Sequence, residues 1–165
     1  MALGRPVSLK NATITLKDGS GTPNTLVVKI GEGSMSSTES HPRDFKLDRG
    51  ILSSGYVRDA DDEPLQLTVE SEWTSLVGST GDSPTPYEFM KQQGLASAYV
   101  TTGDDCDPYC IDITVLLDNS ECASSENETL TFSKFYVEQI DFNFDDGTLS
   151  FQGRCKTTAP TSVRA

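Results

Sequence analysis

The chain has little of what acid–base or nucleophilic catalysis requires. Its only histidine, His41, lies in a serine-rich segment immediately before Pro42. A catalytic base needs an oriented partner and a nucleophile held against it, and a loop of this composition provides neither. The chain also has no GxSxG, HExxH, phosphate-loop or dinucleotide-binding motif. We therefore expect that the protein is not an enzyme, binds no cofactor and carries His41 as an exposed loop residue.

Basic residues and long apolar runs are also scarce. The 165 residues include 13 Lys and Arg against 25 Asp and Glu, giving a net charge of −12. Tight binding of nucleic acid needs clustered cations, so this balance argues against it. The acidity suits either a simply soluble surface or one that repels DNA. No run approaches the roughly 18 apolar residues of a membrane span, and residues 1–10 lack the apolar core of a signal peptide. We expect no membrane association and synthesis in a cytoplasm.

Alternation of apolar and polar residues with a period of two is abundant. It is clearest from Leu65 to Trp73, where Ser71 is the only weak position on the apolar side and where Trp73 is expected in the core. This period is that of a half-buried β-strand. Similar patterns occur at 12–16, 25–30, 45–47, 51–57, 97–101, 110–118, 130–137 and 140–151. An Asp-Gly pair at 146–147 lies inside the last of these and indicates a hairpin turn.

One short helix interrupts the strands. Thr85, Pro86 and Glu88 occupy the N-cap, first and third positions of a capping box, and Gly94 follows as a stop signal. We expect a helix at about 86–93 on a single, mainly β domain of sandwich or barrel type. That domain spans 1–165 and includes a polar N-terminal arm (1–11), a long loop or extended hairpin tip (31–42) and a polar C-terminal arm (156–165).

The four cysteines leave three alternatives open. Cys106 and Cys110 form a CxxxC pair, Cys122 follows the next strand and Cys155 ends the last one, so all four lie near strand ends. Free thiols suit a cytoplasmic product and disulfides suit a particle that leaves the cell. A zinc cluster is less favoured because the second pair has no CxxC spacing. We expect no metal and a structural role in every case.

The order of several segments resembles that of a known family. These segments are Asp48-Arg49-Gly50, 59–73, 84–94, 110–118 and Gly153-Arg154-Cys155. Together they resemble the major tail proteins of long-tailed bacteriophages, which are the subunits of the tail tube, over residues 12–156. The resemblance implies a β-sandwich or barrel-like sheet flanked by one helix, similar to the type VI secretion tube protein. It also implies that six copies form a ring with a continuous inner barrel, and that rings stack into a tube.

The resemblance implies a function as well. It predicts a structural virion protein that is assembled in the host bacterial cytoplasm and forms the tail channel for genome ejection. Its partners would be further copies of itself, the tape measure, tail terminator and tail tip proteins, and transiting double-stranded DNA without tight binding. Two alternatives remain: a capsid decoration or adhesin-like β-sandwich that binds other molecules, and a zinc enzyme built on the cysteines.

Candidate site residues follow from the tube hypothesis. Carboxylates on the polar faces of central strands would line the lumen without holding DNA, because each cation facing a phosphate adds affinity. The lumen candidates are Glu70 and Glu72, followed by Asp112 and Asp141. The long loop and the arms would contact neighbouring subunits. The candidates for contacts between rings are Ser34, Met35, Ser36, Ser37, Thr38, Glu39 and Ser40.

Overall fold

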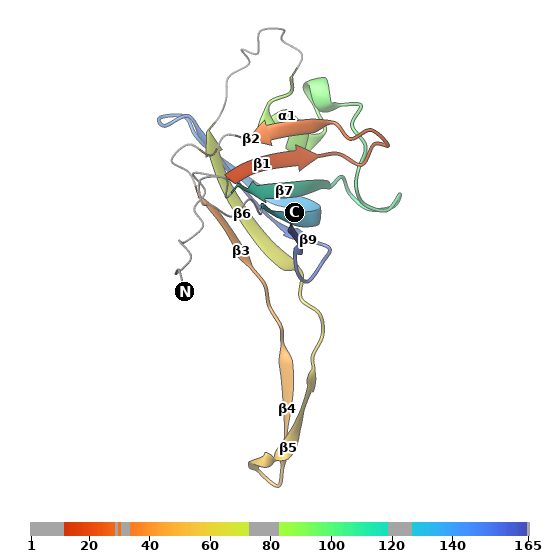
Figure 1. The fold of residues 1–165 in the computed structure, drawn as a ribbon, viewed down its shortest axis with the longest axis vertical. Helices are drawn as coiled ribbons and strands as arrows, with labels where there is room; N and C mark the ends of the chain where they lie inside the picture. The colour runs from red at the N-terminus through yellow and green to blue at the C-terminus, as the bar shows by residue number, and fades with distance from the viewer. Residues whose placement is uncertain (1–11, 29, 31–33, 73–82, 119–126, 165) are drawn as a thin grey trace.

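The computed structural model describes residues 12–28, 30, 34–72, 83–118 and 127–164 (Figure 1). These residues form ten strands, one α-helix and one short 3-10 helix. The strands are β1 (Ala12–Lys17), β2 (Thr25–Val28), β3 (Met35–Thr38), β4 (Arg43–Asp48), β5 (Ile51–Asp59), β6 (Leu65–Glu72), β7 (Ile111–Leu117), β8 (Glu128–Asn143), β9 (Thr148–Cys155) and β10 (Thr161–Arg164). The helices are α1 (Pro86–Lys91) and η2 (Gly94–Ala96). The predicted mainly β class with one short helix is confirmed, and the described strands form no closed barrel.

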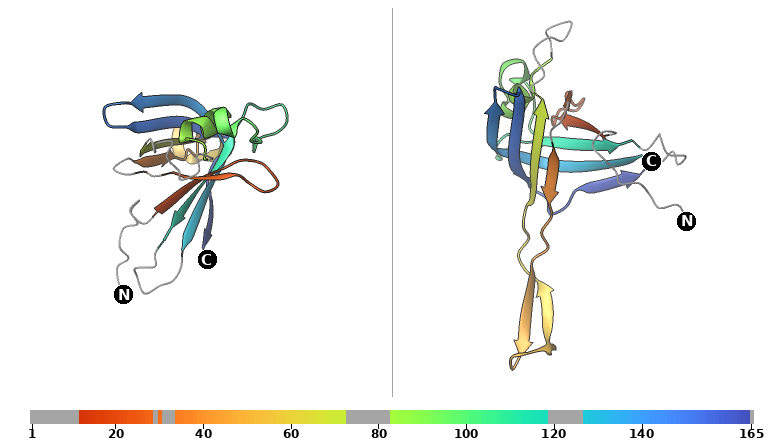
Figure 2. Two further views of the ribbon diagram at one scale, coloured as in Figure 1. Left: turned by 90° about the horizontal axis from the view of Figure 1, so that it is seen from above. Right: turned by 90° about the vertical axis from the view of Figure 1, so that its left-hand side faces the viewer.

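Eight of the strands form one antiparallel sheet that the long strand β8 divides into two parts. The order is β2-β1-β7-β8-β9-β6-β3, with β10 also paired to β8. The first half of β8 pairs with β7 and β10, and its second half pairs with β9. In Figure 2 (right), β6 and β9 run across the direction of β7 and of the first half of β8. Because β8 passes from one part to the other, the two parts can enclose a common core.

Irregular pairing bends β8 at two places. The register shifts once against β7, between Ile111 and Ile113, and once against β9, between Val137 and Gln139. Near the first shift Lys134 has a φ of 53°, and its backbone N–H donates to the carboxylate of Asp112 at 2.9 Å. Bulges of this kind increase twist and re-aim side chains. The bend lets one strand serve both parts of the sheet.

The core lies between the two parts of the sheet and under helix α1. Ser71, the weak position of the β6 pattern, is fully buried and its Oγ donates to the Leu149 carbonyl at 3.4 Å. Trp73 lies outside the described residues. The largest fully buried side chains are Phe89, Phe135, Phe151, Ile14, Leu16, Leu65, Leu67, Ile111, Ile113, Leu149 and Val69. Apolar residues at every second position of β1, β6, β7 and β9 therefore supply the core, as their period of two predicts.

The capping box of α1 forms as the sequence predicts. The Glu88 N–H donates to Thr85 Oγ1 at 3.2 Å, and the Thr85 N–H donates to Glu88 Oε2 at 3.0 Å. The helix ends at Lys91, earlier than the predicted residue 93, because Gln92 adopts a left-handed conformation with a φ of 52°. Phe89 lies on the buried face, with its ring centroid 5.1 Å from that of Tyr99. Packing stabilises a helix too short to persist alone.

Removing the N-cap tests the contribution of this box. Thr85→Ala should lower the free energy of unfolding by about 1 kcal/mol, because the Glu88 N–H loses its acceptor. Thr85→Ser keeps the hydroxyl and should recover most of that loss. Urea titrations of the two variants measure the difference. Equal stabilities for both variants would mean that the lost methyl group, and not the cap, accounts for the change.

Three segments differ from the sequence-based expectations. The long loop predicted at 31–42 contains strand β3, which pairs with β6, and the tip of the extended hairpin lies further along, between β4 and β5. The predicted C-terminal arm contains β10, which pairs with the start of β8. The strand predicted at 97–101 is wrong, because this segment forms turns after η2 and pairs its backbone with the β1–β2 loop.

The buried carboxylate of Asp18 organises that last contact. It is only 3% exposed and accepts hydrogen bonds from the backbone N–H of Asn24 at 2.6 Å and that of Val100 at 3.2 Å. Burial alone would raise the pKa of Asp18, but the hydrogen bonds from Asn24, Ser20 and Val100 together hold it below its ordinary value. A carboxylate with these donors stabilises the fold only while it is ionised.

Asp18→Asn should therefore lower the free energy of unfolding by about 2 kcal/mol at pH 7, because an amide accepts these N–H groups less well than a charged carboxylate. The folded pKa is depressed, so the stabilisation is complete above the unfolded pKa of about 3.9 and is lost as the pH falls through the folded pKa. Urea titrations should give a smaller difference from wild type at pH 3 than at pH 7. A difference independent of pH would show that ionisation of Asp18 is not involved.

Candidate interaction surfaces

One continuous polar face covers four neighbouring strands, in the order β3, β6, β9 and β8. Burial along β6 alternates strictly, so Gln66 and Glu72 are exposed while their neighbours in the strand are buried. The strands are in register, which places polar residues opposite polar residues. These cross-strand pairs are Ser36 with Thr68, Thr38 with Gln66, Thr68 with Gln152, Glu70 with Ser150, Glu72 with Thr148, and Asp141 with Ser150. The apolar face of the same sheet is turned into the core.

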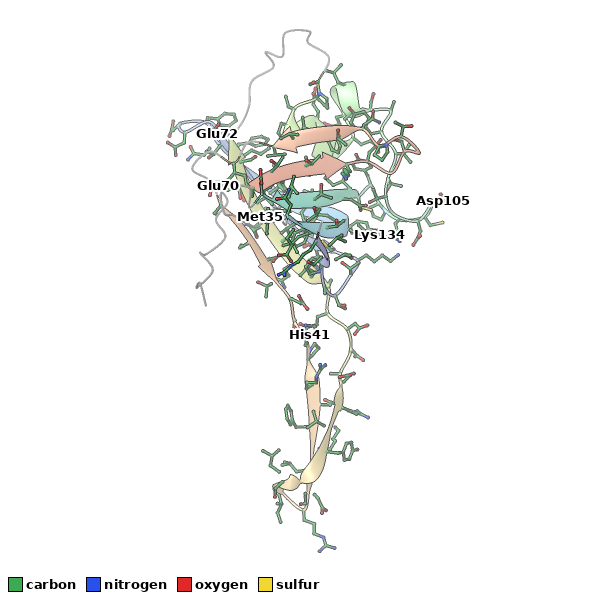
Figure 3. The ribbon with its side chains drawn as sticks, in the orientation of Figure 1. Met35, His41, Glu70, Glu72, Asp105 and Lys134 are labelled. Atoms are coloured by element: carbon green, nitrogen blue, oxygen red, sulfur yellow. The ribbon has the colours of Figure 1, made fainter. Side chains whose placement is uncertain are left out.

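Carboxylates dominate the charge of this polar face. Among the described residues it carries Glu70, Glu72, Glu138 and Asp141 against one base, Arg154. Figure 3 shows Glu70 and Glu72 next to each other on β6, away from Asp105 and Lys134 at the opposite side of the body. The sheet thus presents a wet, acidic surface opposite its buried side.

The structure brings three of the four lumen candidates together. Glu70, Glu72 and Asp141 lie on the polar face, and Asp141 also accepts a hydrogen bond from Gln139 at 2.7 Å. Asp112 lies apart in β7, where it pairs with Lys17 of β1 and accepts the N–H of Lys134. Its carboxylate stabilises the bend of β8 and is not part of the polar face.

Both ends of this four-stranded unit have edges that no described strand covers. Strand β3 pairs with β6 on one side only, and the second half of β8 pairs with β9 on one side only. The Glu70 N–H donates to the Ser34 carbonyl at 2.8 Å. Hydrogen-bonded pairs alternate along an antiparallel ladder, so Met35 and Ser37 direct their backbone N–H and C=O groups away from β6. The edge offers unpaired donors and acceptors to another strand.

A hairpin made of β4 and β5 projects from the body as an arm (Figures 1 and 2). Its turn contains Arg49 and Gly50, both with positive φ. Six large apolar side chains on it are more than half exposed: Phe45, Leu47, Ile51, Leu52, Tyr56 and Val57. Phe45 and Val57 pair on one face, and Tyr56 lies on the other with Lys46. Apolar exposure of this extent on both faces is typical of a surface that binds another molecule.

Ion pairs connect the two strands of this arm. Arg58 donates to the Asp44 carboxylate through Nε at 3.0 Å and Nη2 at 2.8 Å. Arg43 Nη1 lies 2.7 Å from Asp59 Oδ1. At the base of the arm the exposed His41 pairs with Glu39 (Figure 3). The expectation of an exposed loop histidine agrees with this position.

The candidates for contacts between rings lead into the arm. Ser36, Ser37 and Thr38 are exposed on the edge strand β3, whereas Met35 is half-buried against the core. The Ser34 carbonyl accepts a hydrogen bond from the Glu70 N–H. Glu39 and Ser40 connect β3 to the arm. This segment is therefore partly a structural strand and not a free loop.

The described cysteines form no metal-binding group. Cys106, Cys110 and Cys155 are free thiols, and Cys122 lies outside the described residues. No group of three or more possible ligands that could hold a metal occurs within the described ranges. Burial raises the pKa of the Cys155 thiol to about 12, with Asp112 and Cys110 adding to the effect. At neutral pH this thiol is protonated and a weak nucleophile.

Sequence reasoning missed two features of these surfaces. The alternation in β4 and β5 predicted ordinary strands, because a pattern does not reveal whether its apolar face meets a core or a partner. The pairing of Arg154 with Glu138 depends on a register shift that no local pattern encodes. One sequence signal could have indicated a solvent-exposed arm. The charged residues Arg43, Asp44 and Lys46 lie next to the apolar residues of β4.

Comparisons with known proteins show a shared fold. A chain of the structure described as "Cryo-EM Structure of an Extracellular Contractile Injection System, PVC sheath/tube terminator in extended state" matches with a TM-score of 0.62 at 10% identity, covering 98% of this chain and 99% of that chain. A chain of the PVC sheath-tube complex in the extended state matches with a TM-score of 0.57 at 9% identity, covering 97% and 93%. A chain of the anti-feeding prophage (AFP) baseplate matches with a TM-score of 0.53 at 10% identity, covering 98% and 97%.

These similarities concern the fold, because the sequences share so few identities. No protein-family model matches the chain, and no curated protein matches it in sequence. Within the described ranges no helix is long and apolar enough to cross a membrane.

Proposed function

We propose that this protein is a non-enzymatic tube subunit of a contractile tail or injection particle. Copies join edge to edge into a ring, which we take to be hexameric, and rings stack into a tube. The observation that carries the proposal is a four-stranded sheet with an acidic, polar face and, at each end, an edge that no described strand covers. The fold shared with chains of contractile injection systems supports the same assignment.

The free edges support ring closure. A sheet with exposed edges invites uncontrolled pairing, and closed sheets avoid the problem because they have no edge. Here the outward groups of β3 on one copy can pair with the second half of β8 on the next. Pairing of unlike edges is a heterologous contact, which closes into a ring when the rotation between copies allows it. The polar face then lines the lumen, and the core and helix lie outside it.

The projecting arm supports contact between rings. A two-stranded hairpin alone is marginally stable in water, yet this one exposes apolar side chains on both faces. A second copy of the chain in the adjacent ring is the partner that a repeating tube provides for every arm. The apolar pair Phe45 and Val57 would be buried in that contact.

The acidic lumen suits passage of a polyanion. Phosphate groups bind cations through release of counterions, and a wall of carboxylates offers no such gain. In a phage tail the cargo would be double-stranded DNA, and the tape measure, terminator and tip proteins would complete the tube. The particle would assemble in the bacterial cytoplasm and function as part of the virion or of a related injection machine.

A proline at the free edge tests the proposal. The Ser37 N–H points away from β6, so Ser37→Pro removes an outward donor and should spare the β3–β6 ladder. We expect wild type and Ser37→Ala to form rings or tubes by negative-stain electron microscopy, and Ser37→Pro to sediment as a monomer. Thermal unfolding confirms that the variant is folded. Normal rings from folded Ser37→Pro would exclude pairing through this edge.

A further inference from the structure

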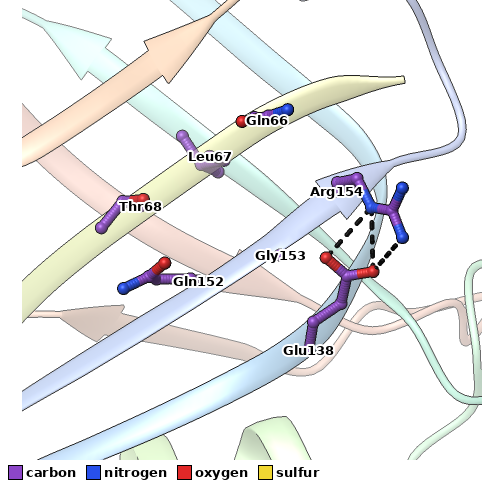
Figure 4. Close-up of a pocket in the computed structure, with 7 residues that line it drawn as sticks. All are labelled: Gln66, Leu67, Thr68, Glu138, Gln152, Gly153 and Arg154. Atoms are coloured by element: carbon purple, nitrogen blue, oxygen red, sulfur yellow. Dashed lines mark hydrogen bonds and ion pairs between the residues drawn. The ribbon is translucent and has the colours of Figure 1, made fainter. Parts of the chain in front are cut away.

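Among the residues that the structure describes, the polar face contains one cation, Arg154, which lines a hollow of about 240 Å³. Figure 4 shows this hollow between β6, β9 and β8, with Arg154 and Glu138 on one side. The other lining residues are Gln66, Leu67, Thr68, Gln152 and Gly153. A cationic side chain in this position would attract a passing phosphate more strongly than any other described residue of the polar face.

The guanidinium of Arg154 is engaged by Glu138 through both carboxylate oxygens. Arg154 Nε donates to Oε1 at 2.8 Å and to Oε2 at 3.0 Å, and Nη2 donates to Oε1 as well. The hydrogen bonds and charge of Glu138 raise the pKa of Arg154. These charge-assisted contacts use two of the five guanidinium N–H groups, the Nε–H and one Nη2–H, and they set a carboxylate charge directly against the charge of Arg154.

The sheet places Glu138 there by means of its second register shift. Glu138 is the extra residue of β8 between Val137 and Gln139, and so has no partner of its own in β9. Gly153 permits the close approach of the strands, because a Cβ there would lie 1.9 Å from the Tyr136 carbonyl oxygen. Both features serve to bring this carboxylate beside Arg154.

We propose that Glu138 masks Arg154, so that the channel wall presents only carboxylates to a passing polyanion. This inference rests on the proposed function, because it requires the polar face to line the lumen. In a ring every copy contributes one Arg154, and unmasking them would create a belt of cations. Each phosphate that a cation neutralises adds affinity through counterion release, so such a belt would retain DNA.

Two variants with the same change in net charge separate masking from bulk charge. Glu138→Gln and Asp141→Asn each remove one carboxylate from the same face, but only Glu138→Gln frees Arg154. The probe is a fluorescent linear DNA duplex, co-sedimented with assembled rings or tubes at a series of NaCl concentrations. We expect Glu138→Gln to bind DNA at least about tenfold more tightly than wild type at low salt, with a steeper salt dependence. Asp141→Asn should stay within about twofold of wild type.

Removing the arginine provides the confirming control. The double variant Glu138→Gln with Arg154→Gln should return to the wild-type affinity, because no cation remains to be unmasked. Arg154→Gln alone should change DNA binding by no more than about twofold, since a cation already neutralised by Glu138 adds little counterion release. This single variant also decides the matter if Glu138→Gln does not assemble, because a large loss of DNA binding would mean that Arg154 was never masked.

The outcomes distinguish this inference from the proposed function. Equal DNA binding by assembled Glu138→Gln and Asp141→Asn would overturn masking while leaving the tube intact. Wild-type protein that forms no rings in the same micrographs would overturn the tube and masking with it.

Discussion

Replacing Phe45 and Val57 with serine should abolish stacking into tubes and leave the body of the protein folded. These two side chains pair on one face of the arm and are 61% and 55% exposed, so the isolated subunit gains little from them. Exposed substitutions usually change the free energy of unfolding by less than about 0.5 kcal/mol. A contact between rings that buries both side chains would lose most of its apolar area.

Electron microscopy and sedimentation measure this effect. The matched control is Ser53→Ala with Ser54→Ala, which changes two exposed residues of the same arm and should leave tubes unchanged. Single rings without tubes are expected for the Phe45 and Val57 variant. Tubes of normal length from that variant would exclude the arm as the contact between rings. Deleting residues 34–40 would not isolate the arm, because it would also remove strand β3 and the packing of Met35.

Replacing Glu70 and Glu72 with lysine should convert a channel that binds DNA weakly into one that retains DNA. Both side chains lie on the polar face of β6, where water-exposed positions accept such changes, so rings should still assemble. Each subunit changes by four charge units at these positions, and the ring multiplies the effect. Proteins that make six to ten phosphate contacts lose about 10³–10⁵ in affinity between 50 and 200 mM salt. We expect at least about a hundredfold gain in DNA affinity at 50 mM salt, lost at high salt.

A charge-matched variant controls for the total charge of the protein. Asp61→Lys with Glu63→Lys makes the same change in the exposed segment between β5 and β6, outside the strands that form the polar face. Co-sedimentation of duplex DNA with assembled rings should show a much smaller gain for this variant. Equal gains for the two variants would place Glu70 and Glu72 outside the lumen. A stalled genome in particles that carry the Glu70 and Glu72 exchange would be the corresponding result in infection.

The sequence predicts those features that depend on neighbours along the chain. The period of two from Leu65 to Glu72 needs only one buried face, and the capping box at Thr85 needs only residues three apart. The strand predicted at 97–101 was wrong because the Asp18 carboxylate, more than 80 positions away, binds the Val100 N–H. Contacts across such separations leave no periodic signal.

The candidate surface was predictable in part for the same reason. Alternation correctly placed Glu70 and Glu72 on a polar face. It also predicted a polar face for Asp112, whose carboxylate instead accepts the Lys134 N–H at the bend of β8. The continuous 16-residue strand β8 was predicted as parts of two segments, 130–137 and 140–151, because the register shift between Val137 and Gln139 interrupts the alternation. The two free edges follow from topology alone, which no pattern within a single strand reveals.

Electron cryo-microscopy of the purified protein at high concentration tests directly whether the protein forms rings through its sheet edges. We expect closed rings in which β3 of each copy pairs with the second half of β8 of the next, with Glu70 and Glu72 facing the lumen. Monomers at every concentration, or rings that carry Glu70 and Glu72 on their outer surface, would contradict it.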